Sequence, residues 1–262
     1  MKPAAILIPF GLLAVLVAGE EDEDEPVGRV QRDVRTERFA TAIVCGVCHA
    51  NQEDSGVLRD TLGRGIAPYD LWRSTMMANS ARDPFHHAAV AAAVAAAPDR
   101  KAEIEAGCLV CHSPMGTHEV RAAGRSGMEM ADLWRDFEEE EEDLAAIAQD
   151  GVSCTLCHQI TEEGQGSPKT YDGNFGIGDG KEIFGPHDDQ FGLPMNKVTE
   201  YWPVEGQHLL DSGHCASCHT QTLPAGGFEQ ATVGEWRNAE FFGQQTCPEC
   251  HAPTTSGGGA KI

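Results

Sequence analysis

The chain has few aromatic side chains, which make up 6% of its 262 residues, and little positive charge. Lys and Arg number 19 against 41 Asp and Glu, so the formal net charge is −22. A chain this acidic repels a phosphate backbone, which excludes nucleic acid as a natural partner. With so few aromatic residues and 29 glycines, the chain also has little material for an ordinary hydrophobic core.

No hydrophobic run beyond the N-terminus approaches the roughly 20 residues that a membrane span needs. At the N-terminus, Lys2 precedes an apolar run over residues 4–17 that ends in Ala18 and Gly19. This pattern predicts an export signal over residues 1–19, cleaved near Ala18 or Gly19, with an uncleaved anchor as the alternative. We therefore expect a periplasmic or secreted protein whose mature chain has no transmembrane span.

The rest of the chain divides into a short linker and one domain. An acidic run opens residues 20–38, which we predict to be a disordered linker, and residues 39–262 form the domain. An Asp-Pro pair at its start and a proline at its end predict a helix over residues 84–97. Helical spacing of apolar residues continues over residues 130–148. The glycine-rich stretch 162–195 predicts a long ordered loop with one short hairpin.

No cysteine stands alone, because all ten fall in Cys-x-x-Cys pairs and a histidine follows each pair directly. Numbered along the chain, motifs 1 to 5 are Cys45, Cys48 and His49; Cys108, Cys111 and His112; Cys154, Cys157 and His158; Cys215, Cys218 and His219; and Cys247, Cys250 and His251. Cys-x-x-Cys-His is the attachment motif of c-type haem. Residues three apart share a helix face, so two thiols can bond one porphyrin while the histidine ligates its iron.

Other uses of paired cysteines explain the pattern less well. A single Cys-x-x-Cys is typical of a zinc site, a redox dithiol or a disulfide. Four-cysteine zinc sites use two pairs each and would leave a fifth pair over, and disulfides, although suited to an exported protein, do not require a histidine after every pair. Five covalently bound haem c groups are therefore the predicted cofactors, with their irons as the metal.

Six histidines remain as candidates for the opposite, distal side of the five irons. His86 and His87 are neighbours and project about 100° apart on a helix, so at most one faces a given haem, and we include His87. His214 cannot easily bend onto its own haem but can reach a neighbouring one. The predicted distal ligands are His208, His118, His187, His87 and His214.

Methionine is the competing distal ligand, since Met–His ligation occurs in cytochromes c. The available donors are Met76, Met77, Met115 and Met195. Each on its own is more simply explained as filling gaps in an irregular interior. We retain Met77 and Met195 as the less favoured distal candidates.

The motifs and their surroundings resemble the multihaem c-type cytochromes related to the tetrahaem electron acceptor of hydroxylamine oxidoreductase. The similarity covers most of the chain from Phe39 to Pro253 and includes residues 71–84, 151–154 and 208–220. It implies a mainly α, loop-rich fold with little or no sheet, in which packed, largely bis-histidine haems form the core. This chain differs in its fifth motif and is similar to longer chains, which leaves open a C-terminus that continues beyond residue 262.

The predicted function is electron transfer through five haems, and we favour a carrier over an enzyme that transforms a substrate. An enzyme is the first alternative, a reductase or oxidase acting on a small nitrogen or sulfur species at a five-coordinate haem. The second is a subunit of a haem wire or larger redox complex. The acidity of the chain favours a redox partner protein with a basic docking surface.

Overall fold

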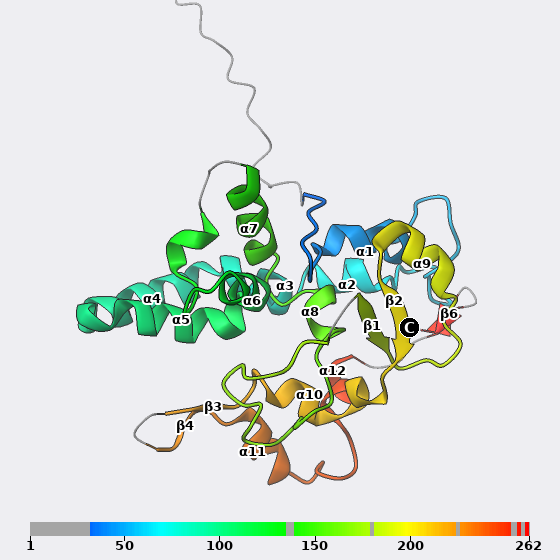
Figure 1. Cartoon of the computed structure of the whole chain (residues 1–262). Helices are drawn as coiled ribbons and strands as arrows, with labels where there is room; N and C mark the ends of the chain where they lie inside the picture. The colour runs from blue at the N-terminus through cyan, green and yellow to red at the C-terminus, as the bar shows by residue number, and fades with distance from the viewer. Residues whose placement is uncertain are drawn as a thin grey trace, which may run out of the picture. The chain divides into compact units, whose positions relative to one another are not determined.

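The computed structural model describes residues 32–134, 139–178, 181–223, 226–252, 256–257 and 260–261. The predicted export signal and the linker as far as residue 31 lie outside this part. The described chain is mainly helical, with a few two-stranded pairings joined by long loops (Figure 1). The prediction of a mainly α, loop-rich fold is confirmed. No helix in the described ranges is long and apolar enough to cross a membrane.

The helices are α1 (Ala42–His49), α2 (Pro68–Trp72), α3 (Met76–Asn79), α4 (Pro84–Ala96), α5 (Lys101–His112), α6 (Pro114–Ala122), α7 (Glu139–Gln149), α8 (Cys154–Cys157), α9 (Gly192–Thr199), α10 (Ser212–Ala216), α11 (Thr232–Arg237) and α12 (Cys247–His251). Short 3-10 turns occur at Ser80–Arg82, Pro98–Arg100, Met130–Leu133 and Gln207–Leu210. The strands are β1 (Glu182–Gly185), β2 (Trp202–Glu205), β3 (Gln221–Thr222), β4 (Phe228–Gln230), β5 (Ser256–Gly257) and β6 (Ala260–Lys261).

Helix α4 forms where its sequence signals predict it. The Asp83 carboxylate accepts a hydrogen bond from the Phe85 N–H at 2.9 Å, and Pro84 occupies the first helical position, where no N–H is needed. A 3-10 turn that begins at Pro98 leads into α5, which packs antiparallel to α4 (Figure 1). The prediction of a helix over residues 84–97 is confirmed, and its hairpin with α5 brings it beside motif 2.

Two other local predictions have different outcomes. The helical pattern over residues 130–148 appears as the 3-10 turn Met130–Leu133 and helix α7, with residues 135–138 outside the described ranges. The short hairpin predicted within residues 162–195 is wrong, because β1 pairs in parallel with β2, with Glu182 opposite Trp202. Helix α9 lies between these strands along the chain, so the strand that pairs with β1 lies beyond the glycine-rich stretch.

Residues 32–38, predicted as the end of the linker, pack against the domain. Val34 is buried in the same hydrophobic cluster as Phe39. The Val34 backbone N–H donates to the Thr41 hydroxyl at 3.1 Å, and Arg35 forms a β-bridge with Ala40. The ordered domain therefore begins before residue 39.

The hydrophobic residues of the described chain collect in four separate clusters rather than one continuous core. The cluster around Phe39 joins residues near motifs 1 and 3, and that around Leu109 lies among α5, α6 and α7. Several large apolar side chains remain outside, including Phe85 at 82% exposure and Phe191 at 80%.

Candidate haem sites

All five motifs occupy helical turns, so each presents its cysteine pair on one face. Motifs 1, 2 and 5 end helices α1, α5 and α12, and motif 3 forms α8. Motif 4 begins in α10 and continues as a turn, in which the His219 N–H donates to the Cys215 carbonyl at 3.0 Å. This geometry meets the requirement that two thiols reach one porphyrin while the histidine beside them reaches its centre.

The cysteines are free to form thioether bonds. All ten are unpaired thiols. Across the described residues, no group of three or more His, Cys, Asp or Glu side chains is arranged to hold a metal ion. A closed zinc site needs four such ligands, whereas a porphyrin supplies four nitrogens and leaves one or two positions for the protein. The donor set present in the chain therefore fits a haem.

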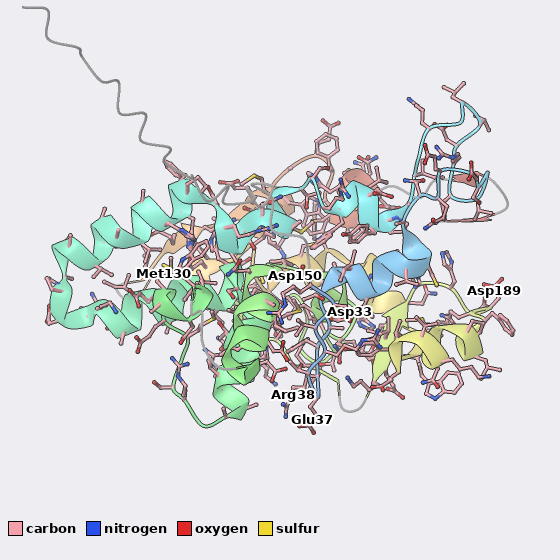
Figure 2. The ribbon with its side chains drawn as sticks, turned by 90° about the horizontal axis from the view of Figure 1, so that it is seen from above. Asp33, Glu37, Arg38, Met130, Asp150 and Asp189 are labelled. Carbon is pink, nitrogen blue, oxygen red and sulfur yellow. The ribbon has the colours of Figure 1, made fainter. Side chains whose placement is uncertain are left out.

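Motifs 1 and 3 meet although they are far apart in the sequence. The Cys45 thiol is hydrogen-bonded to that of Cys154, and this bond holds the pKa of Cys45 below its usual value. The buried Asp150 side chain joins the two helices, since it accepts from the Ala42 N–H at 2.8 Å and from the Ser153 hydroxyl. Figure 2 shows Asp150 between α7 and α1. One carboxylate thus positions the starts of both motif-bearing helices.

Motif 4 contacts both motif 2 and motif 5. A hydrogen bond from Cys218 lowers the pKa of Cys111. Burial, together with the neighbouring Cys247, raises the pKa of Cys215 to about 12. A cavity of about 330 Å³ lies where α5 approaches β3, and its lining includes Cys111 and Asp172. The five motifs therefore form contacting pairs: 1 with 3, 2 with 4, and 4 with 5.

Two of the proximal histidines have the second ring nitrogen fixed by the backbone. Nδ1 of His112 lies 3.3 Å from the Ser80 carbonyl oxygen, and Nδ1 of His158 lies 2.6 Å from the Phe184 carbonyl oxygen. Histidines that bind metals usually donate this N–H to a carbonyl or carboxylate, which leaves Nε2 for the metal. The local geometry of motifs 2 and 3 therefore suits axial ligation.

The other three proximal histidines have less uniform surroundings. Burial lowers the pKa of His49, with a further effect from His158. Burial also lowers the pKa of His219, whose Nδ1 lies 3.3 Å from the side-chain amide of Gln230. All three of these residues are exposed. Motifs 1, 4 and 5 therefore present exposed proximal histidines, unlike motifs 2 and 3.

Among the predicted distal ligands, His118 and His214 are half-buried imidazoles whose neutral forms are favoured. Burial lowers the pKa of each to about 4. The Nε2 atom of His118 is buried without a hydrogen-bond partner, and its ring lies against Phe39 and Phe175. The pKa of His214 is further lowered by His158 of motif 3, a neighbour outside its own motif. A neutral imidazole is the form that binds a metal.

The remaining predicted ligands make contacts of their own. Nε2 of His208 lies 2.9 Å from the Ile160 carbonyl oxygen, and its ring is 6.5 Å from that of His214. His187 follows β1, and its carbonyl accepts a hydrogen bond from the Gln190 side chain. Nε2 of His87 lies 2.8 Å from a backbone carbonyl oxygen, that of Ala81.

The methionine candidates are divided between surface and interior. Met76 and Met77 are exposed. Met115 is fully buried in the cluster around Phe39, and Met195 packs against the cluster that contains Tyr201. The packing of Met115 and Met195 agrees with a gap-filling role.

His86 was not among the predicted distal ligands, but the structure places it at motif 2. The His86 ring stacks on that of His112, with centroids 3.6 Å apart and planes at 5°. A sequence signal could have found it, because Val90 and Val94 follow His86 at four-residue spacing along the alanine-rich helix. That spacing marks the inward face of α4, whereas His87 is aligned with exposed Ala91.

Comparison of the chain with protein-family models, with curated proteins and with solved structures gave no match. The resemblance to multihaem cytochromes accordingly stays a prediction that rests on the motifs themselves.

Proposed function

We propose that this protein is an exported multihaem c-type cytochrome that transfers electrons through five covalently bound haems. The observation that carries the proposal is the fivefold Cys-x-x-Cys-His motif, set each time in a helical turn with free thiols. Each bound haem would supply an iron that alternates between the ferric and ferrous states. The motif cysteines would anchor each haem through thioether bonds, and the motif histidines would bind its iron.

The contacts between motifs support transfer from one centre to the next. Motifs 1 and 3, 2 and 4, and 4 and 5 are in thiol contact or close electrostatic contact. Burial lowers the pKa of His214, and so does His158, which relates motif 4 to motif 3 as well. These contacts would join all five centres into one connected array with motif 4 at its branch point.

The divided hydrophobic interior supports a structural role for the haems. Four small clusters and exposed side chains such as Phe85 leave apolar surface that a porphyrin face could cover. Burial of several hundred Å² per haem, at about 25 cal/mol per Å², would contribute on the order of 10 kcal/mol before entropy is subtracted. We infer that the haems complete the core of this protein.

The charge of the chain supports a basic redox partner. A net charge of −22 attracts proteins of opposite sign and accelerates their encounter at low ionic strength. We place this exchange in the periplasm or outside the cell, where the predicted export signal would deliver the chain. A subunit of a larger redox assembly would use the same surface.

The test is expression with an export signal and the c-type maturation machinery. The expected product is red, contains five haems per chain by pyridine haemochrome, and exceeds the processed polypeptide mass by five haems. A colourless protein, or one with the bare polypeptide mass, would refute the proposal. Electron paramagnetic resonance separates carrier from enzyme, because a carrier should show low-spin irons, whereas a high-spin iron that shifts with nitrite or cyanide indicates an open site.

A further inference from the structure

Helices α4 and α5 bring a second imidazole to motif 2. His86 lies in the first turn of α4, and His112 ends α5, which packs antiparallel to α4. Their rings are parallel to within 5°, with centroids 3.6 Å apart. Motif 2 is therefore a site at which two imidazoles from different helices converge.

The His86 ring is buried in a way that its protein neighbours do not explain. The residue is 8% exposed, and both of its ring nitrogens are buried without a hydrogen-bond partner. Leaving a buried polar group unsatisfied costs about 1–3 kcal/mol, so such a group calls for a partner. Nδ1 of His112, in contrast, already faces the Ser80 carbonyl oxygen, which leaves its Nε2 for a metal.

The neighbouring histidine is a natural comparison. His87 is in the same turn of α4, but its Nε2 lies 2.8 Å from the Ala81 carbonyl oxygen, and its ring meets Trp134 edge-on at 5.7 Å. Its Nε2 atom is therefore already occupied by a backbone carbonyl. The two adjacent histidines therefore differ: the ring nitrogens of His86 have no hydrogen-bond partner beside His112, whereas Nε2 of His87 already faces a carbonyl oxygen.

We propose that His86 is the second axial ligand of the iron anchored by Cys108, Cys111 and His112. The inference rests on the proposed function, since it requires a haem at motif 2. The stacked rings must separate to admit the iron, and no hydrogen bond holds the His86 ring in its present position. This iron would then be closed to external ligands, which favours electron transfer over substrate binding at motif 2.

The experiment compares His86→Ala with the matched variant His87→Ala in the fully matured protein. We expect H86A to convert one of the five irons from low-spin to high-spin in electron paramagnetic resonance, and added imidazole to return it to low-spin. H87A should leave the low-spin count as in the unmodified protein. Retention of every low-spin iron in H86A, or loss of one in H87A instead, would overturn the assignment.

A conservative variant guards against a folding defect in H86A. In His86→Met the iron should stay low-spin while one reduction potential rises, because methionine ligation raises the potential of a haem. If spectroelectrochemistry of H86M finds every potential unchanged, His86 is not a ligand. Haem counting keeps the two proposals apart: fewer than five haems in the unmodified protein would refute the proposed function, whereas five haems with an unchanged H86A spectrum would refute only the ligand.

Discussion

Replacement of Asp150 tests whether a single carboxylate positions motifs 1 and 3. Asp150 is 3% exposed and accepts hydrogen bonds from the Ala42 N–H at the start of α1 and from the Ser153 hydroxyl just before α8. In Asp150→Ala both donors lose this acceptor inside the protein. Two such variants, Asp150→Ala and Asp150→Asn, separate the loss of the acceptor from the loss of its charge.

The expected magnitude follows from these two bonds. A hydrogen bond to a charged group contributes about 1.5–3 kcal/mol, so the loss of two such bonds in D150A should lower the free energy of unfolding by about 3–6 kcal/mol. D150N retains one acceptor oxygen and loses the charge that favours the N-terminus of α1, so a loss of about 1–2 kcal/mol is expected. The smaller loss in D150N would show that the acceptor matters more than the charge.

Urea unfolding of the matured protein, followed by circular dichroism of the helices, measures these differences. Asp189→Ala is the matched control, because Asp189 is exposed and lies at the edge of the molecule in Figure 2. The control should change stability by no more than about 0.5 kcal/mol. If D150A behaves like D189A, Asp150 does not join the two motifs energetically.

Three further predictions concern other parts of the chain. Arg125→Ala removes the charged partner of the buried Asp132 carboxylate, which Arg125 binds through two hydrogen bonds at 2.7 and 3.1 Å and which also accepts from the Glu129 N–H. Thermal unfolding should show a loss of about 2–3 kcal/mol, and an unchanged melting temperature would contradict this. Gly151→Ala should lower the free energy of unfolding by about 2 kcal/mol or more, because φ at this residue is +69° and the added Cβ would lie 2.7 Å from the Met77 carbonyl oxygen. The control is Gly234→Ala in α11, where the added Cβ meets open space, so this change should be neutral or stabilising. The chain produced without haem should bind an apolar fluorescent dye and unfold without a cooperative transition; cooperative melting of the haem-free chain would show that its core is complete without the cofactor.

Local sequence signals predicted the local features of the fold. The Asp-Pro pair before the alanine-rich run located α4 because capping depends on neighbouring residues alone. The pairing of β1 with β2 was missed, because strand partners separated by a helix are not visible in the spacing of either segment. Val34 was likewise assigned to the linker, since its burial depends on residues as distant as Phe175.

The residues of the candidate site also differ in how far the sequence alone predicts them. The ten cysteines and five proximal histidines follow from one short motif. The distal side depends on which helix face meets which motif, and that is a property of packing. His86 and His87 illustrate this, because only the packing of α4 against α5 distinguishes the ring that stacks on His112 from the ring that faces the Ala81 carbonyl oxygen.

The interleaved pairing of motifs limits how this chain can be divided. Motif 1 finds its neighbour in motif 3, and Ala42 is held by Asp150, which lies 108 residues further along the chain. Motif 2 finds its neighbour in motif 4, on the far side of motif 3. A cut anywhere between motifs 2 and 3 would separate both pairs at once, so we expect that neither half would fold on its own. During synthesis neither of these pairs can form until motif 3 has been made.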